Sequence, residues 1–434
     1  MFGYYLDLAL QSLRRNKVLT ALMVLAIALG IGACMTTFTV LHVLSGDPLP
    51  GKSARLFYPQ LDPRDMIDYG ADKDPASQVT WTDGMNLLKA KRAERQVLMT
   101  GGDVPVQPAQ SGLEPFLSDA RYTTADFFPM FETPFLFGHG WSEAEDNGKA
   151  RVAVITRTLN DKLFGGKDST GQILRMKDTA FQVIGVLDTW RPNPHFYDLN
   201  MGNYAATEDV FVPLATARDV RLERDGSMNC WGKGSGDAEH LEAATCVWLQ
   251  FWVQLESADK AAAYRTFLDN YSKEQKALGR FQRPPNVRLP NLMEWMDINK
   301  VVPSDVRLQG WLALGFLLVC LVNTVGLMLA KFLRRSGELG VRRALGASKR
   351  EVFMQLLVEA AVIGLAGGIG GLLLAFLGLW LVRLQPADYA SLAHLDLSML
   401  LATFMLAIAA SLLAGLLPAW RACQIAPALQ LKSQ

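Results

Sequence analysis

Four long apolar stretches alternate along this chain with segments in which polar and apolar positions mix. The apolar stretches cover residues 18–44, 307–331, 351–383 and 397–420. Each is long enough to cross a hydrocarbon core as a helix, which takes about 20 residues. The mixed segment at 45–306 has the pattern of a water-soluble domain. The chain is therefore predicted to be a membrane α-helical protein with four transmembrane helices and one large domain inserted between helices 1 and 2.

Within the inserted segment, alternating apolar and polar positions predict strands, and longer periodic stretches predict helices. The expected strands are 151–155, 181–187, 209–214 and 247–255, and the expected helices are 81–95 and 258–278. The order strand, helix, strand occurs near residues 54–100 and again near 247–290. We therefore expect an α+β domain of two lobes, one formed by residues 50–135 with 247–300 and the other a strand-rich lobe inserted at 136–246.

The distribution of Lys and Arg predicts the orientation in the membrane, because cytoplasmic loops carry an excess of positive charge. Residues 332–350, between the second and third spans, are rich in Arg and Lys, whereas residues 384–396 are not. Basic residues also precede the first span, in an amphipathic segment at 1–17. We therefore expect both termini, including the tail at 421–434, in the cytoplasm, and the domain at 45–306 on the outer side together with the turn at 384–396.

Composition narrows the classes of function. Of the 434 residues, 50% are hydrophobic and 20% are charged, and the formal net charge is +1. The basic residues form no stripe with interleaved aromatic side chains, so no nucleic acid is expected as a partner. No G-x-S-x-G, H-E-x-x-H or C-x-x-C motif occurs, and the five histidines stand far apart. We therefore expect a non-catalytic chain with no metal site and no cofactor of its own.

One short motif has the letters of a nucleotide-binding loop. Residues 46–53 read Gly-Asp-Pro-Leu-Pro-Gly-Lys-Ser, which fits the pattern of G, four residues, then GKS. Such a loop holds phosphate only between a buried strand and the N-terminus of a helix. Here a predicted membrane helix comes before the motif and two prolines lie inside it. We expect an ordinary turn that leaves the membrane.

Cys230 and Cys246 are the only cysteines in the segment expected on the outer side. Because that compartment is usually oxidising, we expect a disulfide between them, worth about 3 kcal/mol by loop closure. The alternative is two unpaired side chains packed near Trp231 and Trp248.

The basic segment at 332–350 has the pattern of a short amphipathic helix. Glu338 and Arg342 stand four residues apart in the order that stabilises a helix. Gly346 can end this helix, and Ser348 with Glu351 forms a capping-box pattern that starts the third span. A rigid helix joined this closely to a transmembrane helix can push it. An ordinary basic loop would explain the arginines but not the glycine spacing or the cap.

This stretch resembles the coupling helix of MacB/FtsX-type ABC transporter permeases, whose members carry an E-x-G-x-R-R-A-L-G-A-like sequence. Further similar stretches lie at residues 9–17, 126–138, 152–155, 163–166, 183–186, 355–359 and 415–422. The resemblance spans nearly the whole chain, and it makes the lobe at 50–135 with 247–300 a porter-like lobe. The polar insertion at 221–246 does not match the family pattern, so its role stays open.

The resemblance implies a bacterial inner-membrane permease that works as a dimer, with a second copy or a sister permease, on two cytoplasmic ABC ATPase subunits. ATP and Mg²⁺ would be bound by those subunits, and the large domain would be periplasmic. No ATPase pattern occurs here, so we expect the ATPase to be a separate subunit. By the same resemblance, six residues are expected to meet the ATPase: Glu338, Gly340, Arg342, Arg343, Gly346 and Ala347.

Members of this family export small toxins or peptides, release lipoproteins from the membrane, or control cell-wall hydrolases. The first hypothesis is therefore a permease that exports or extracts a substrate, with a periplasmic adaptor or an outer-membrane channel as further partners. A second keeps the fold but makes it a mechanotransmission device for an outer hydrolase. A third is an ATPase-independent membrane sensor, against which the coupling motif argues. The sequence does not separate the first two.

Two features of the third span need explanation. Glu359 is an acidic residue inside a predicted transmembrane helix, where such residues are usually functional or paired. Because it lies near the cytoplasmic end, we favour structural pairing with arginines. Glycines at 364, 367, 368, 370 and 371 allow another helix to approach closely. The sequence leaves open whether that helix belongs to this chain or to a second permease.

Overall fold

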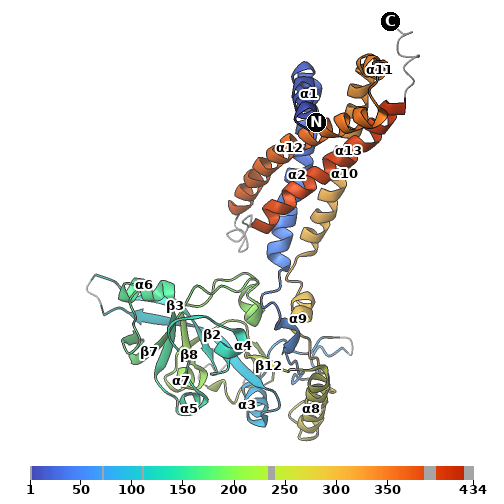
Figure 1. Ribbon diagram of the computed structural model, residues 1–434. Helices are drawn as coiled ribbons and strands as arrows, with labels where there is room; N and C mark the ends of the chain where they lie inside the picture. The colour runs from blue at the N-terminus through green and yellow to red at the C-terminus, as the bar shows by residue number, and fades with distance from the viewer. Residues whose placement is uncertain (1, 71–72, 110–111, 233–239, 386–396, 425–434) are drawn as a thin grey trace. The chain divides into compact units, whose positions relative to one another are not determined.

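The computed structural model describes residues 2–70, 73–109, 112–232, 240–385 and 397–424. These residues form two units, a helical unit made of residues 1–45 and 302–434 and an inserted domain made of residues 46–301 (Figure 1). Residues 386–396 of the predicted outer turn, residues 425–434 of the predicted tail and residues 233–239 of the insertion lie outside the described residues.

In the helical unit, four of the described helices are long and apolar enough to cross a membrane. They are α2 (Lys17–Ser45), α10 (Ser304–Arg334), α12 (Lys349–Arg383) and α13 (Leu397–Gln424). The inserted domain lies in the sequence between α2 and α10. The predicted fold class, four membrane helices with a domain inserted after the first, is confirmed.

The glycines of α12 allow it to pack closely against two helices of the same chain. A Cβ at Gly367 would lie 2.6 Å from Ile27 Cγ2 on α2, and a Cβ at Gly364 would lie 2.0 Å from Ser411 Cβ on α13. Such distances leave room for hydrogen only, so these positions require glycine. The open question of the glycine face is thereby answered for these two positions, because both meet this chain's own helices.

Two shorter helices complete the helical unit. The N-terminal helix α1 (Phe2–Arg15) packs against α12, with Ala9 buried and Leu13 in contact with the helical core. The helix α11 (Ser336–Ala344) lies between α10 and α12 in the sequence. It corresponds to the predicted coupling helix.

The inserted domain is organised around one mixed sheet, which has ten strands among the described residues. Its main order is β1-β12-β2-β3-β8-β5-β7-β4, while β6 pairs with β2 and β7, and β9 pairs with β2. The strands are β1 (Leu56–Phe57), β2 (Arg95–Gln107), β3 (Phe116–Thr123), β4 (Phe135–Gly138), β5 (Val152–Thr156), β6 (Ile173–Met176), β7 (Thr179–Leu187), β8 (Val210–Pro213), β9 (Glu223–Asp225) and β12 (Gln250–Gln254). A separate ladder pairs β10 (Asn229–Cys230) with β11 (Cys246–Val247).

The two segments predicted as separate lobes share this sheet. Strand β3, from the first segment, pairs in parallel with β8, from the strand-rich segment at 136–246. The β6 and β9 strands of the strand-rich segment also pair with β2. The predicted boundary between lobes therefore runs through a sheet and does not separate two of them. Alternation of residue types identifies strands but not the strands with which they pair, which is why the sequence suggested two bodies.

Helices cover this sheet and fill its edges. They are α3 (Trp81–Ala90), α4 (Phe127–Phe131), α5 (Glu143–Asn147), α6 (Arg157–Phe164), α7 (Leu214–Asp219), α8 (Ala258–Ala277) and α9 (Leu292–Ile298), with 3-10 turns η1 (Ser53–Arg55) and η2 (Phe196–Met201). The predicted helix at 81–95 ends earlier, because Lys91 takes a left-handed conformation and β2 begins at Arg95.

Candidate functional site

The helix α11 is joined tightly to the membrane helices on both sides. Arg335 alone separates it from α10. On the other side, Gly346 has φ +104°, a conformation that suits glycine and turns the chain. Ser348 then caps α12: it accepts from the Glu351 N–H at 3.2 Å, and its own N–H donates to the Glu351 carboxylate at 2.8 Å. This capping box fixes where α12 starts, so a displacement of α11 is passed directly to α12.

The charged residues of α11 contact this chain itself. Arg342 donates to Gln355 on α12 at 3.1 Å and lies 3.5 Å from the Glu338 carboxylate. Arg343 donates to the backbone oxygen of Cys423 on α13 at 3.2 Å. Glu338, Arg342 and Arg343 are half-buried, and together they hold α11 against α12 and α13.

The other predicted coupling residues divide between the two sides of α11. Gly340 is buried, Ala347 is half-buried and Gly346 is exposed. The most exposed apolar side chains of this segment are ones that the sequence reasoning did not select, Leu345 at 83% and Val341 at 47%. Their spacing of four residues, noted as an amphipathic signal, could have identified them. ATPase contact by the six predicted residues stays a prediction.

A buried charge cluster connects α11 to three other helices. The Glu359 carboxylate on α12 lies 2.7 Å from Lys331 Nζ on α10 and 3.1 Å from Arg335 Nη1. Ser12 of α1 donates to the same carboxylate and accepts from Arg335 at 2.6 Å. Glu359 and Lys331 are fully buried, so each charge needs the other. The predicted pairing of Glu359 is confirmed.

The cluster continues into α11 through Arg335, which lies 3.2 Å from the Glu338 carboxylate. Partial burial acts to raise the pKa of Glu338. The hydrogen bond and positive charge of Arg335, together with Arg342, outweigh burial and lower the pKa. Glu338 therefore stays ionised at neutral pH and continues the charge network from Glu359 into α11.

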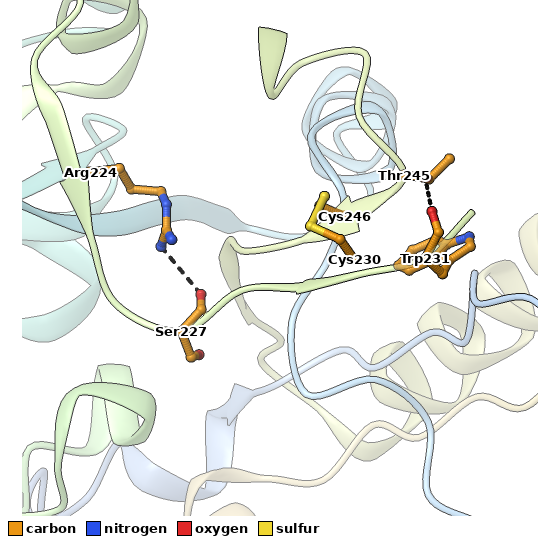
Figure 2. The surroundings of a disulfide bond; sticks show 6 residues. All are labelled: Arg224, Ser227, Cys230, Trp231, Thr245 and Cys246. Atoms are coloured by element: carbon orange, nitrogen blue, oxygen red, sulfur yellow. Dashed lines mark hydrogen bonds between the residues drawn. A yellow bond between two sulfur atoms is a disulfide. The ribbon is translucent and has the colours of Figure 1, made fainter. Parts of the chain in front are cut away.

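In the inserted domain, Cys230 and Cys246 form a disulfide (Figure 2). They are directly opposite each other in the ladder of β10 and β11. Next to the bond, the Trp231 N–H donates to the Thr245 backbone oxygen at 3.0 Å, and the Thr245 hydroxyl donates to the Trp231 oxygen. The alternative of two unpaired thiols is not what the structure shows. The bond fixes the base of the polar insertion.

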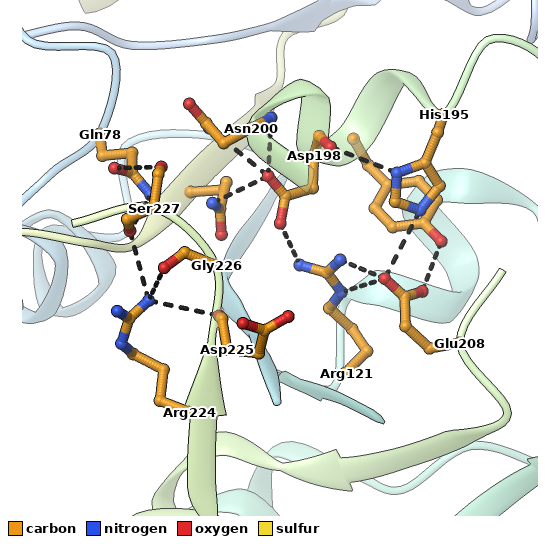
Figure 3. Close-up of polar contacts among 12 residues, drawn as sticks. Gln78, Arg121, His195, Asp198, Asn200, Glu208, Arg224, Asp225, Gly226 and Ser227 are labelled. Carbon is orange, nitrogen blue, oxygen red and sulfur yellow. Dashed lines mark hydrogen bonds and ion pairs between the residues drawn. The ribbon is translucent and has the colours of Figure 1, made fainter. Parts of the chain in front are cut away.

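A second buried charge cluster, which the sequence did not reveal, lies behind the central strands (Figure 3). Arg121 on β3 is fully buried and donates to Asp198 at 2.6 Å and, through Nε, to Glu208 at 3.0 Å. Tyr197 donates to Glu208 at 2.7 Å, and His195 Nε2 lies 3.5 Å from it. These residues come from distant parts of the sequence, so no local motif marks them.

The electrostatics of this cluster are those of a structural brace. Burial acts to raise the pKa of Glu208, but Arg121 and His195 outweigh it and lower the pKa well below the usual range. The fully buried Arg121 is satisfied by two carboxylates, and Gln250 on β12 donates to Asp198 at 3.0 Å. The cluster therefore ties β3 and β12 to the η2 segment.

Two expectations about ligands can be compared with the structure. Lys52 of the nucleotide-loop motif is buried, donates to the Pro129 oxygen at 2.9 Å and pairs with Glu132 at 3.3 Å. Its ammonium group is thus engaged by protein, and the segment continues into η1 and β1 as a turn. Among the described residues, no group of three or more His, Cys, Asp or Glu side chains is arranged to hold a metal ion.

Comparisons with known proteins agree with this architecture. A family model described as "MacB-like periplasmic core domain" matches residues 20–270, and one described as "FtsX-like permease C-terminal" matches residues 311–427. The first match covers more than half of the chain. The second includes α11, α12 and most of α13.

Individual relatives are more distant. The chain is 27% identical to a pyoverdine export ATP-binding/permease protein, PvdT, from Pseudomonas syringae over 311 residues, which cover 71% of this chain and 42% of that protein. It is 25% identical to a macrolide export ATP-binding/permease protein, MacB, from Azoarcus over 434 residues, covering 98% of this chain and 59% of that protein. The chain therefore spans about half the length of these relatives.

Among solved structures, the periplasmic region of MacB from Actinobacillus actinomycetemcomitans aligns with a TM-score of 0.36 and 11% identity. The alignment covers 58% of this chain and 95% of that one.

Proposed function

This chain belongs to the family of ABC transporter permeases that combine a MacB-like periplasmic core domain with an FtsX-like permease region, and from that membership we propose how it works. It is the permease subunit on which a cytoplasmic ABC ATPase acts. Movement of the ATPase displaces α11, and the membrane helices pass that movement to the inserted domain, which lies in the periplasm and exports or extracts a substrate.

The observation that carries this proposal is the buried charge cluster around Glu359. It joins α11 through Arg335 to α1, α10 and α12. Two of these, α10 and α12, are connected to α11 by very short segments. Because buried ion pairs keep their geometry only when every charge is paired, the cluster makes α11 and the cytoplasmic ends of these helices move together.

The exposed apolar residues Val341 and Leu345 supply the ATPase contact in this proposal, with Gly346 beside them. Exposed apolar side chains at the centre of a contact carry much of its binding energy. Glu338, Arg342 and Arg343 instead hold α11 in position. The chain binds no nucleotide itself; ATP and Mg²⁺ belong to the ATPase subunits, and two permeases, identical or paralogous, sit on an ATPase dimer.

The orientation follows the distribution of positive charge, with both termini in the cytoplasm of a bacterium and the inserted domain outside its inner membrane. Export is favoured over mechanotransmission because the relatives named above are described as export proteins. Control of a cell-wall hydrolase without transport is the alternative function, and it would share the same coupling machinery. A periplasmic adaptor or an outer-membrane channel would be a partner in the first case only.

The test is to purify the full chain from its own membrane in a mild detergent, with every protein that accompanies it. We expect an ABC ATPase subunit in the complex, with ATP turnover that changes when the permease is removed. A co-purifying adaptor or channel supports export, and a hydrolase supports mechanotransmission. A chain that performs its outer-side activity in liposomes with no ATPase present contradicts the proposal.

A further inference from the structure

The inserted domain contains a large cavity that none of the interactions above explains. Its volume is about 1190 Å³, and it lies between α3 on one side and α5 and α7 on the other. Ligand pockets for drug-sized molecules have volumes of about 300–1000 Å³, so this cavity has room for a molecule at the large end of that class.

Aromatic and aliphatic side chains form the apolar part of the wall. They include Trp81, Met85 and Leu88 of α3, together with Phe128 and Trp141. Trp141 meets Phe128 edge-to-face, with ring centroids 4.7 Å apart, and Trp81 stacks on Trp248. These contacts fix the rings before any ligand arrives. The wall is therefore ready to receive a hydrophobic surface at little cost in side-chain entropy.

The charged lining residues have an acidic surplus. The acidic ones are Glu94, Asp126, Glu132, Glu143, Asp146, Asp219 and Glu242, and the basic ones are Lys89, Lys91, Arg95, Lys149 and Arg218. Most of the carboxylates already have a cationic partner, such as Lys91 on Glu143 at 2.6 Å, Lys149 on Asp219 at 2.5 Å and Arg218 on Glu242 at 2.6 Å.

Asp126 and Asp146 differ from the other carboxylates. Among the described residues, neither has a Lys, Arg or His within ion-pair distance. Each accepts backbone hydrogen bonds: Gln96 N–H donates to Asp126 at 2.9 Å, and Ala125 N–H donates to Asp146 at 2.6 Å. The Trp141 indole N–H also donates to Asp146, at 2.8 Å. Asp146 is thus bound to a ring of the aromatic wall.

From this arrangement we infer that the cavity is a binding site for a hydrophobic ligand carrying a cationic amine, with the ammonium group beside Asp146 and Asp126 and the apolar body against Trp81 and Phe128. An ammonium group there would gain two unpaired carboxylates and the faces of aromatic rings. The inference rests on the proposed function, for which it names a substrate class.

Electrostatics support this assignment. Burial raises the pKa of Asp146 to about 7, and the negative charges of Asp126 and Glu143 raise it further, against the two hydrogen bonds that lower it. Burial also raises the pKa of Asp126, while Arg95 and Lys91 act to lower it. An unpaired acidic pair that resists ionisation accepts a cation readily, because the cation removes the repulsion between the two charges.

The test uses the full chain in lipid nanodiscs, without any ATPase. The probe is a benzophenone-bearing alkyl primary amine, compared with its neutral N-acetyl analogue, and cross-linked peptides are mapped by mass spectrometry. We expect the amine to label residues around the cavity and its apparent affinity to exceed that of the analogue. The affinity should rise between pH 6 and pH 8 as Asp146 ionises, while that of the analogue should not change.

Two variants sharpen the test. Asp146→Asn should weaken amine labelling about tenfold, the loss expected for one charged hydrogen bond, and leave the analogue unaffected. Ala215→Trp, which fills the cavity from α7, should weaken both probes. The control is Asp178→Asn, an exposed carboxylate outside the cavity, which should change neither.

Equal labelling by amine and analogue, or labelling that the cavity variants do not reduce, would overturn the inference. Displacement of the probe by a hydrophilic lysine peptide as effectively as by unlabelled amine would also overturn it, since the site would then read charge alone. If Asp146→Asn fails to fold, the pH dependence of the wild-type protein decides. The ATPase assay is independent of this labelling, so failure of the cavity assignment and failure of the proposed function can be told apart.

Discussion

Glu359 on α12 and Lys331 on α10 form a fully buried ion pair, with the Lys331 Nζ 2.7 Å from the carboxylate. The two residues lie 28 positions apart, on either side of α11. Arg335 adds a second contact to the same carboxylate and links it to Glu338. The pair therefore closes a loop of which α11 is the exposed part.

Removal of this carboxylate should be costly. Glu359→Ala leaves Lys331 buried without a partner, and breaking such a pair costs about 3–5 kcal/mol. Thermal unfolding of the full chain in nanodiscs should show this loss. The double replacement Glu359→Leu with Lys331→Leu removes both charges, so it should recover most of the stability. A single alanine variant as stable as the wild type would show that the pair does not form.

Reversal of charge at Glu338 should disconnect α11. Glu338→Lys places a cation next to Arg335 and Arg342, whereas Glu338→Gln keeps the size and loses only the charge. We expect the lysine variant to insert into the membrane but to lose most of the permease-dependent ATP turnover of the purified complex. The glutamine variant should keep more of it. Equal turnover in both variants and the wild type would contradict the bracing role.

Leu345 should matter to the ATPase and not to the fold. It is 83% exposed, so Leu345→Asp removes no packing. We expect the variant to bind the ATPase subunit at least about tenfold more weakly, the loss expected when a central apolar contact is removed. Affinity is measured by co-purification at graded ATPase concentrations. Leu384→Asp, at the other end of α12 and 64% exposed, is the matched control and should bind normally.

The disulfide should stabilise the inserted domain. In the double variant Cys230→Ser with Cys246→Ser, the free energy of unfolding should fall by about 3 kcal/mol, because closing a loop of this length restricts the unfolded chain. Resistance to proteolysis under non-reducing and reducing conditions measures the effect. The wild type should become as sensitive as the variant after reduction. Equal resistance before reduction would show that the bond adds nothing.

Asp146 should make stability depend on pH in an unusual direction. Burial raises its pKa to about 7 in the folded protein, whereas the unfolded value is near 3.8. Between these values the folded state binds more protons, so the contribution of Asp146 to stability falls as pH rises from about 4 to about 7. Asp146→Asn should lack this fall. The difference in melting temperature between wild type and variant at pH 5 and pH 8 measures it, and an identical difference at both values would refute it.

Much of the architecture follows from the sequence alone. Long apolar stretches identified the four membrane helices, because a span needs a continuous run of apolar residues and nothing else in the chain has one. The pattern Glu338 to Glu351 indicated both α11 and the capping box, since helix pairs and caps are local interactions. The disulfide could be predicted because only two cysteines lie in the inserted segment.

The tertiary structure decided which parts of the chain meet. Strands β3 and β8 pair across the boundary expected between two lobes, and Arg121 finds its carboxylates 77 and 87 positions away. The structure also turned Arg342 inward and Leu345 outward. Sequence patterns report local periodicity, whereas strand order, buried ion pairs and cavities depend on contacts between residues far apart in the chain, which only the folded molecule specifies.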